Sequence, residues 1–328
     1  MMNPYSIEKI KQMEKKISIN CNDTTLLNSL AIAYLMNSEA NGYNKVDDLL
    51  RQAYTINPCV KTANNYAYQL ICDNFEYQKG IDILQPFVDL TPRSYMPYNL
   101  LGFAYLKSKR YEQANKYLRI AMELSNNKNL SICNNLAVSL SLNNLNEEAY
   151  QLYTNILYKE PITETMYNKA IASVELGSSD ISSLIEQIHK STSYMSSIDN
   201  IDLSVLYYLI NDYHSSYKCL MENCNFSLLE WKSLSFVLYH NNRRKFEEIK
   251  QDAICQRELW KKDFYGNVDY DDCSENEIDS LNNDIQELDK LECHLMCPPV
   301  VNTKELYHTL PIGCMLFDCK VCNNPFDD

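Results

Sequence analysis

The feature that most constrains the fold of this chain is a small residue that recurs about every 35 residues inside an apolar stretch. Ala31, Ala67, Gly102 and Ala137 occupy this position. A second apolar stretch with its own small residue, such as Ala114, follows each of them. Small residues allow two helices to approach closely, and larger side chains around them fill the remaining space. The pattern therefore predicts an all-α chain built from antiparallel helix pairs.

The clearest unit lies within residues 98–121 (YNLLGFAYLKSKRYEQANKYLRIA). Its defining large and small positions are Tyr98, Leu101, Gly102, Tyr105, Ala114, Leu118 and Ala121. This spacing resembles that of the tetratricopeptide-repeat (TPR) family, and the resemblance extends over residues 24–190. Pro92 and Pro161 follow second helices, which fits because the residue before a proline is disfavoured in the α conformation. The resemblance implies a solenoid whose first helices line a concave groove.

The repeat pattern also sets the expected domain boundaries. Residues 1–23 are expected to form an N-terminal capping helix, because a solenoid must cover its open end. Residues 24–190 contain five TPR-like units, and residues 191–262 contain two degenerate TPR-like hairpins, for which an ordinary helical bundle is the alternative. Residues 263–280 are acidic and aperiodic and are interpreted as a linker. Residues 281–328 are expected to form a short helix followed by a Cys-rich tail.

Asparagine occupies the position three residues before the small residue in the first four units, and the matching position before Ile171 in the fifth. The five residues are Asn28, Asn64, Asn99, Asn134 and Asn168. An Asn amide offers two donors and an acceptor, so it can pair with both the N–H and the C=O of an extended peptide. This row resembles the asparagine ladder in the TPR superhelix of O-GlcNAc transferases, which implies that the five residues bind peptide backbone.

Side chains beside the ladder are expected to provide sequence specificity. The candidates in the third unit are Phe103, Leu106 and Lys107. The alternative interpretation is that the asparagines bond to one another or to the neighbouring helix as structural spacers. Asn is a poor residue for a helix interior, so its repetition at one position needs one of these two explanations.

The charge and cysteine content limit the classes of function. The formal net charge of −13 repels phosphate backbones, so no nucleic-acid partner is expected. The same charge favours a basic protein or peptide partner, although it could also serve only solubility. No secretory signal or membrane-spanning run is visible, so no membrane association is expected. The 13 cysteines, several within helical patterns, indicate free thiols in a reducing cytoplasm.

The leading functional hypothesis is a non-catalytic adaptor, chaperone or regulator that binds an extended peptide. No P-loop, HExxH, GxSxG or GxGxxG motif is present in the sequence. The alternative is an enzyme, or an accessory subunit of a peptide-modifying enzyme complex, that acts through a metal-binding C-terminal tail. A peptide-sensing transcription regulator is disfavoured, because no basic helix-turn-helix precedes the repeats.

The Cys-rich tail is predicted to bind about one zinc ion per chain through Cys293, Cys297, Cys319 and Cys322. Cys319 and Cys322 have the CxxC spacing that lets two thiolates share one ion, and the segment is too short to bury a core of its own. An unstructured tail and thiols packed on the last repeat are the alternatives. Elemental analysis of freshly prepared, reduced protein measures the zinc content, and protein without metal would contradict the prediction.

Overall fold

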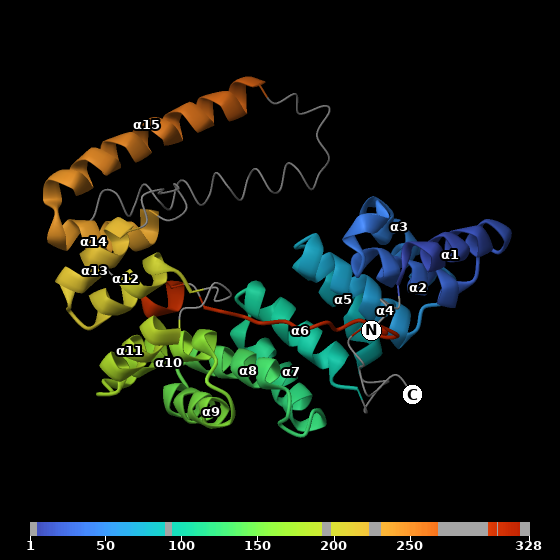
Figure 1. Cartoon of the computed structure of the whole chain (residues 1–328), viewed down its shortest axis with the longest axis horizontal. Helices are drawn as coiled ribbons and strands as arrows, with labels where there is room; N and C mark the ends of the chain where they lie inside the picture. The colour runs from blue at the N-terminus through green and yellow to red at the C-terminus, as the bar shows by residue number, and fades with distance from the viewer. Residues whose placement is uncertain are drawn as a thin grey trace. The chain divides into compact units, whose positions relative to one another are not determined.

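The computed structural model describes residues 5–88, 94–191, 198–222, 231–267, 301–306 and 308–321. These residues form helices and connecting segments and include no β-strand (Figure 1). The fold is all-α and TPR-like, with antiparallel helix pairs packed in succession, as the sequence predicts. The described chain divides into two compact units, with boundaries after Glu160 and after Thr309.

The first unit contains a capping helix and four helix pairs. Its helices are α1 (Ile7–Ile19), α2 (Thr24–Leu35), α3 (Val46–Ile56), α4 (Val60–Tyr68), α5 (Tyr77–Val88), α6 (Met96–Lys107), α7 (Tyr111–Leu124), α8 (Leu130–Leu142) and α9 (Asn146–Lys159). Short 3-10 turns η1 (Ser38–Ala40) and η2 (Tyr43–Lys45) connect α2 to α3. The first helices α4, α6 and α8 are neighbours in space, so residues on them can act on one bound segment.

The second unit contains the remaining described helices. These are α10 (Thr163–Leu176), α11 (Ile181–Ser191), α12 (Asn200–Leu209), α13 (Tyr213–Glu222), α14 (Trp231–Asn241) and α15 (Arg243–Asn267), with the 3-10 turn η5 (Thr303–Glu305). Helix α15 continues beyond Lys262, so the first residues of the segment predicted to be a linker are helical. The residues from Asp263 to Tyr265 include no proline and no capping residue that would end the helix. The rest of that segment lies outside the described residues.

Capping side chains determine where several helices begin. The Asp23 carboxylate accepts a hydrogen bond from the Leu26 backbone N–H at 3.0 Å, at the start of α2. Asn129 accepts one from the Ile132 N–H at 3.2 Å, at the start of α8. Each cap satisfies one of the backbone donors that a helix N-terminus leaves free and is worth about 1 kcal/mol.

The small residues of the repeat pattern lie where two helices meet. A Cβ atom added to Gly102 on α6 would lie 2.5 Å from Cγ of Leu118 on α7. A Cβ added to Gly80 on α5 would lie 2.4 Å from Cγ1 of Ile71. Leu118 and Ile71 are fully buried, so little space exists into which they can move. These close approaches explain why the repeat requires a small residue at each position.

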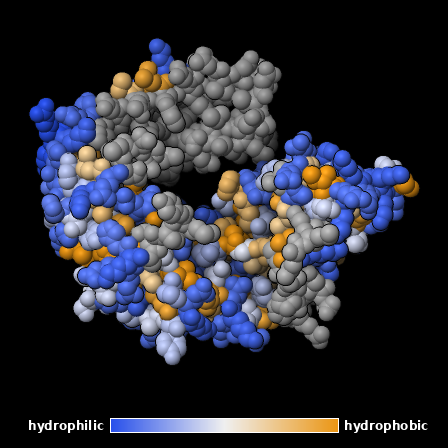
Figure 2. Space-filling model, in the orientation of Figure 1, coloured by the Kyte–Doolittle hydropathy of each residue, from blue (hydrophilic) through white to orange (hydrophobic). Residues whose placement is uncertain are grey.

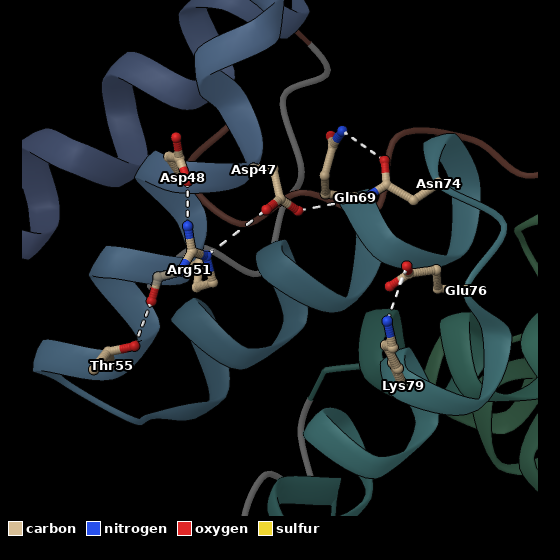
Figure 3. A network of polar contacts seen from close by, with 8 residues as sticks. All are labelled: Asp47, Asp48, Arg51, Thr55, Gln69, Asn74, Glu76 and Lys79. Carbon is tan, nitrogen blue, oxygen red and sulfur yellow. Dashed lines mark hydrogen bonds and ion pairs between the residues drawn. The ribbon is translucent and has the colours of Figure 1, made fainter. Parts of the chain in front are cut away.

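A polar network joins α3 to the turn between α4 and α5 (Figure 3). This turn includes the π-helical segment η3 (Gln69–Asp73). Asn74 donates to the Asp47 carboxylate at 3.3 Å, and Arg51 pairs with Asp47 and Asp48 on its own helix. Partial burial raises the pKa of Asp47 above its usual value. The network thus ties the turn after α4 to α3, a helix of the preceding pair.

Polar side chains cover most of the described surface in the view of Figure 2, and apolar patches are small and scattered. Ile19, Phe75 and Tyr158 are among the few large apolar residues that are strongly exposed. No helix within the described residues is long and apolar enough to cross a membrane.

Replacing Gly102 with Ala is expected to lower the free energy of unfolding by about 1–3 kcal/mol, because the added methyl group overlaps Leu118. The same change made in a Leu118→Ala background should cost close to nothing, since the methyl group then enters a cavity. Urea unfolding of the four proteins measures this coupling. Equal costs in the two backgrounds would contradict the close contact between α6 and α7.

Candidate functional site

A segment of the chain's own C-terminal region lies against the first helices of the repeats, without regular secondary structure up to Leu316 and with turns at residues 317–318 and 320–321. We call residues 308–321 the tail segment. Within the first unit it runs beside α6 and α4, shown in red in Figure 1. Pro311 contacts α8, Met315 contacts α6 and α4, and Lys320 contacts Tyr5, just before α1. The tail segment therefore runs antiparallel to the order of the repeats, and we call the contacted surface of α4, α6 and α8 the binding face.

Asn65 on α4 holds one residue of the tail segment by both backbone groups. Its Nδ2 donates to the Phe317 C=O at 3.0 Å, and its Oδ1 accepts from the Phe317 N–H at 2.8 Å. The side chain is fully buried, so each of these bonds forms in a setting that excludes water. The Asn65 amide thereby supplies the same donor and acceptor that a neighbouring β-strand would offer to one residue.

Asn168 on α10 makes the same pair of bonds within the second unit. Its Nδ2 donates to the Thr309 C=O at 2.9 Å, and its Oδ1 accepts from the Thr309 N–H at 3.0 Å. The Thr309 hydroxyl donates to the Glu164 C=O at 3.1 Å, and Thr303 contacts the Glu175 carboxylate on the same helix. The arrangement seen at Asn65 is thus repeated at an independent place in the chain.

The remaining residues of the ladder are all buried. Asn28 accepts a hydrogen bond from Asn65 Nδ2 at 2.9 Å, so it is bonded within the repeats. Asn64 donates to the Met315 C=O at 2.6 Å, whereas among the described residues Asn99 donates to the Met315 sulfur at 3.3 Å. Asn134 is 1% exposed on α8. Asn28 thus bonds within the repeats, whereas Asn64, Asn99 and Asn168 contact the chain's own tail segment, and the binding of a peptide partner by the ladder stays a prediction.

Two asparagines outside the ladder, Asn65 and Asn135, also contact the tail segment. Asn135 Nδ2 donates to the Pro311 C=O at 2.8 Å. Each follows a ladder residue directly in the sequence. The Asn-Asn pairs in the second and fourth units are the sequence feature from which these two contact residues can be predicted. We did not predict them because the ladder was defined by one position per repeat.

Three buried amide oxygens on the binding face have no hydrogen-bond partner among the described residues. They are the Oδ1 atoms of Asn64, Asn99 and Asn135. A buried acceptor without a partner costs about 1–3 kcal/mol relative to its hydrated state. The tail segment therefore satisfies the binding face only in part.

Apolar contacts fix the far end of the tail segment. Leu316 and Cys319 belong to the buried core of the first unit, together with Tyr5, Leu30 and Leu50. The Tyr5 hydroxyl accepts from the Lys320 N–H at 2.8 Å, and burial raises the pKa of Tyr5 to about 12. This end of the tail segment is thus part of the core rather than a surface strand.

One ion pair accompanies this contact. Lys61 Nζ on α4 lies 3.0 Å from the Asp318 carboxylate. The tail segment thus places a carboxylate at this position, and the expectation of a basic partner stays a prediction.

The expected specificity residues of the third unit lie on α6. Phe103 and Leu106 are buried, at 6% and 4% exposure. Lys107 Nζ lies 5.5 Å from the centre of the Phe103 ring, and burial lowers the pKa of Lys107. Their assignment as specificity residues stays a prediction.

His308 stands at the start of the tail segment, within the second unit. Its Nδ1 lies 2.9 Å from the Leu306 backbone oxygen. Burial lowers the pKa of His308 to about 4, so the imidazole is neutral near pH 7. Burial of the neutral imidazole is fully compatible with folding at a pH above about 6.5, the ordinary pKa of His. As the pH falls from 6.5 toward 4, the unfolded chain binds a proton more readily than the folded unit, so the free energy of unfolding falls.

The predicted zinc ligands lie mostly outside the described residues. Cys293, Cys297 and Cys322 are among the residues the structure does not describe, and Cys319 is buried in the core of the first unit. No group of three or more His, Cys, Asp or Glu side chains within the described residues is placed to hold a metal ion. The zinc site stays a prediction from the sequence.

No protein-family profile and no curated protein sequence matches this chain. Similar solved structures include YrrB, described as a TPR protein with an unusual peptide-binding site, at 13% identity and a TM-score of 0.46, over 64% of this chain and 97% of that chain. MamA is 18% identical with a TM-score of 0.40, over 46% of this chain and 81% of that chain.

The Naa15/Naa10 complex bound to HypK-THB is also similar, at 18% identity and a TM-score of 0.37. That match covers 82% of this chain and 42% of the other. Because all three TM-scores lie below 0.5, the fold assignment rests on the helix pairs of this chain itself, and nothing about function is taken from these proteins.

Replacing Asn65 with Ala should speed hydrogen exchange at the Phe317 amide by about tenfold or more, because this N–H loses its acceptor. Asn168→Ala should do the same at the Thr309 amide. Each variant serves as the control for the other, since each should leave the second amide unchanged. Residue-resolved exchange by NMR measures both, and unchanged exchange in the two variants would contradict the pairing.

Proposed function

We propose that this protein is a non-catalytic interaction scaffold that binds an extended peptide through asparagine side chains on the first helices of its repeats. The observation that supports this most directly is the pairing of Asn65 with both backbone groups of Phe317. Such a pair recognises the backbone and leaves the side chain of the bound residue free to vary. It therefore suits a protein that holds many extended sequences.

The spacing of the backbone contacts supports the same function. In the first unit the amides bond to Pro311, Met315 and Phe317, and these positions differ by even numbers. An extended chain repeats its backbone orientation every two residues. Asn64, which belongs to the predicted ladder, and Asn65 and Asn135, which do not, therefore bond to carbonyls at alternate positions of the segment, and this spacing supports the proposal.

A zinc site at Cys293, Cys297, Cys319 and Cys322 is a separate proposal that rests on the sequence alone. The two proposals share Cys319, which packs in the core of the first unit, whereas the contacts of the asparagines with the tail segment involve no metal. A location in the cytoplasm is likewise a separate proposal, which rests on the cysteine content.

A library of random peptides displayed on phage, selected against the full-length chain, tests the proposed function. The tail segment covers part of the binding face, so the selection is repeated with a full-length Leu316→Asp variant. The carboxylate of that variant cannot remain in the apolar core. Selected peptides are then synthesised, and their dissociation constants are measured by fluorescence anisotropy.

Replacing Asn99 and Asn134 together with Ala should weaken binding of the selected peptides by about tenfold or more, at nearly unchanged thermal stability. Asn155→Ala on α9 is the matched control, because Asn155 is exposed and lies on a second helix. A lower melting temperature with unchanged peptide affinity would show that these asparagines are structural spacers and would contradict the proposal.

A further inference from the structure

We infer that the tail segment is an imperfect and displaceable occupant of the binding face. The partner that displaces it is an extended peptide with a backbone N–H opposite Asn135 and an apolar run followed by an acidic residue. This inference rests on the proposed function and specifies the partner and the regulation of the same site. It follows from four features of the contact between the tail segment and the first unit.

The first feature is the difference between Asn65 and Asn135. Both are fully buried, and both donate to a carbonyl of the tail segment. Asn65 also accepts the N–H of the same residue, Phe317. Asn135 faces Pro311, which has no N–H, so its Oδ1 has no partner among the described residues. A peptide with any other residue at this position can supply the missing bond.

The second feature is the weak contact at Asn99. Its Nδ2 donates to the Met315 sulfur, which is a poor acceptor, and its Oδ1 has no partner within the described chain. Asn99 is fully buried, so neither group gains the hydrogen bonds that water would provide. A ligand that presents backbone groups to Asn99 gains two bonds that the tail segment does not make.

The third feature is the uneven burial of the tail segment. Residues 310–314 are half-buried or exposed, whereas Met315, Leu316 and Phe317 are buried. Within the first unit the segment is thus anchored at residues 315–317, and its less buried residues 310–314 lie beside Asn135. A partner can begin to bind at the less buried part before the anchored part leaves.

The fourth feature defines the chemistry at the anchored end. Met315, Leu316 and Phe317 fill apolar space, and the Asp318 carboxylate pairs with Lys61. A partner that replaces the tail segment must fill the same apolar space, and an acidic group opposite Lys61 adds a modest gain because this ion pair is partly exposed. A basic residue there would face an unpaired lysine, which disfavours binding.

A synthetic peptide with the sequence of residues 310–321 (LPIGCMLFDCKV), kept reduced, tests displacement. The full-length Leu316→Asp chain should bind it at least tenfold tighter than the wild-type chain, whose own tail segment competes for the site. Val321→Asp is the matched control, because Val321 is exposed at the end of the tail segment, and it should bind like wild type. Asp318→Lys, a second variant that places no charge in the core, should bind more tightly than wild type.

A double-mutant cycle tests the missing bond at Asn135. A peptide in which Pro311 is replaced by Ala should bind about fivefold tighter than the natural sequence, because Ala supplies an N–H to Asn135 Oδ1. The gain should disappear when the full-length protein carries Asn135→Ala. Proline also stiffens the free peptide, but this effect on affinity is the same for the wild-type and the Asn135→Ala protein. Comparing the two proteins therefore isolates the bond to Asn135.

The outcomes separate this inference from the proposed function. Equal peptide affinity in the wild-type, Leu316→Asp and Asp318→Lys chains would overturn the inference that the tail segment is a displaceable occupant, and it would leave the proposed function intact. If neither released variant binds this peptide while the library peptides bind in an Asn-dependent way, the tail segment is a permanent part of the core, and only this inference fails. A gain from Pro311→Ala that persists with Asn135→Ala would overturn the assignment of the missing bond. If no peptide of either kind binds, the proposed function fails.

Discussion

The described structure depends on the pairing of buried asparagine amides with the backbone of an extended segment. Taking an amide out of water is costly unless its donors and acceptor are bonded again. The closely packed first helices bury Asn64, Asn65, Asn99 and Asn135 completely. Their amides cannot all be satisfied by the helices that carry them, because those helices already use their own backbone groups. Burial of these side chains therefore creates a requirement for an occupant, and this requirement links the repeat sequence to peptide binding.

Two kinds of contact hold the tail segment, backbone hydrogen bonds and side-chain contacts. The asparagines bond to backbone groups, which every residue except proline possesses in full, so these contacts tolerate many sequences. Leu316 and Cys319 instead pack into the core of the first unit, and Asp318 pairs with Lys61. These contacts depend on side chains. Affinity can thus come from backbone bonds along the segment, while selectivity comes from the side chains of Leu316, Asp318 and Cys319.

The sequence predicts the helix pairs well because the repeat is encoded locally, by small and large residues at helical spacing. It also finds the ladder, since Asn64 and Asn168 lie where a recurring position places them. The tail segment was missed because it has no periodicity of its own, and its conformation is decided by contacts with residues more than a hundred positions away. The short Cys-rich tail pointed to a metal as the means of ordering it. The structure provides another means, since Cys319 packs on a core that the repeats have already formed.

The Asn64-Asn65 pair shows how a helix can match the period of an extended chain. Successive residues on a helix point about 100° apart, so two adjacent asparagines cannot bond to the same residue of a ligand. Asn64 bonds to the carbonyl of Met315, and Asn65 bonds to that of Phe317, two residues further along. These carbonyls point to the same side of an extended segment. A shift of the ligand by one residue would turn both carbonyls away from the helix. The paired asparagines therefore fix the register of a bound segment even though they read none of its side chains.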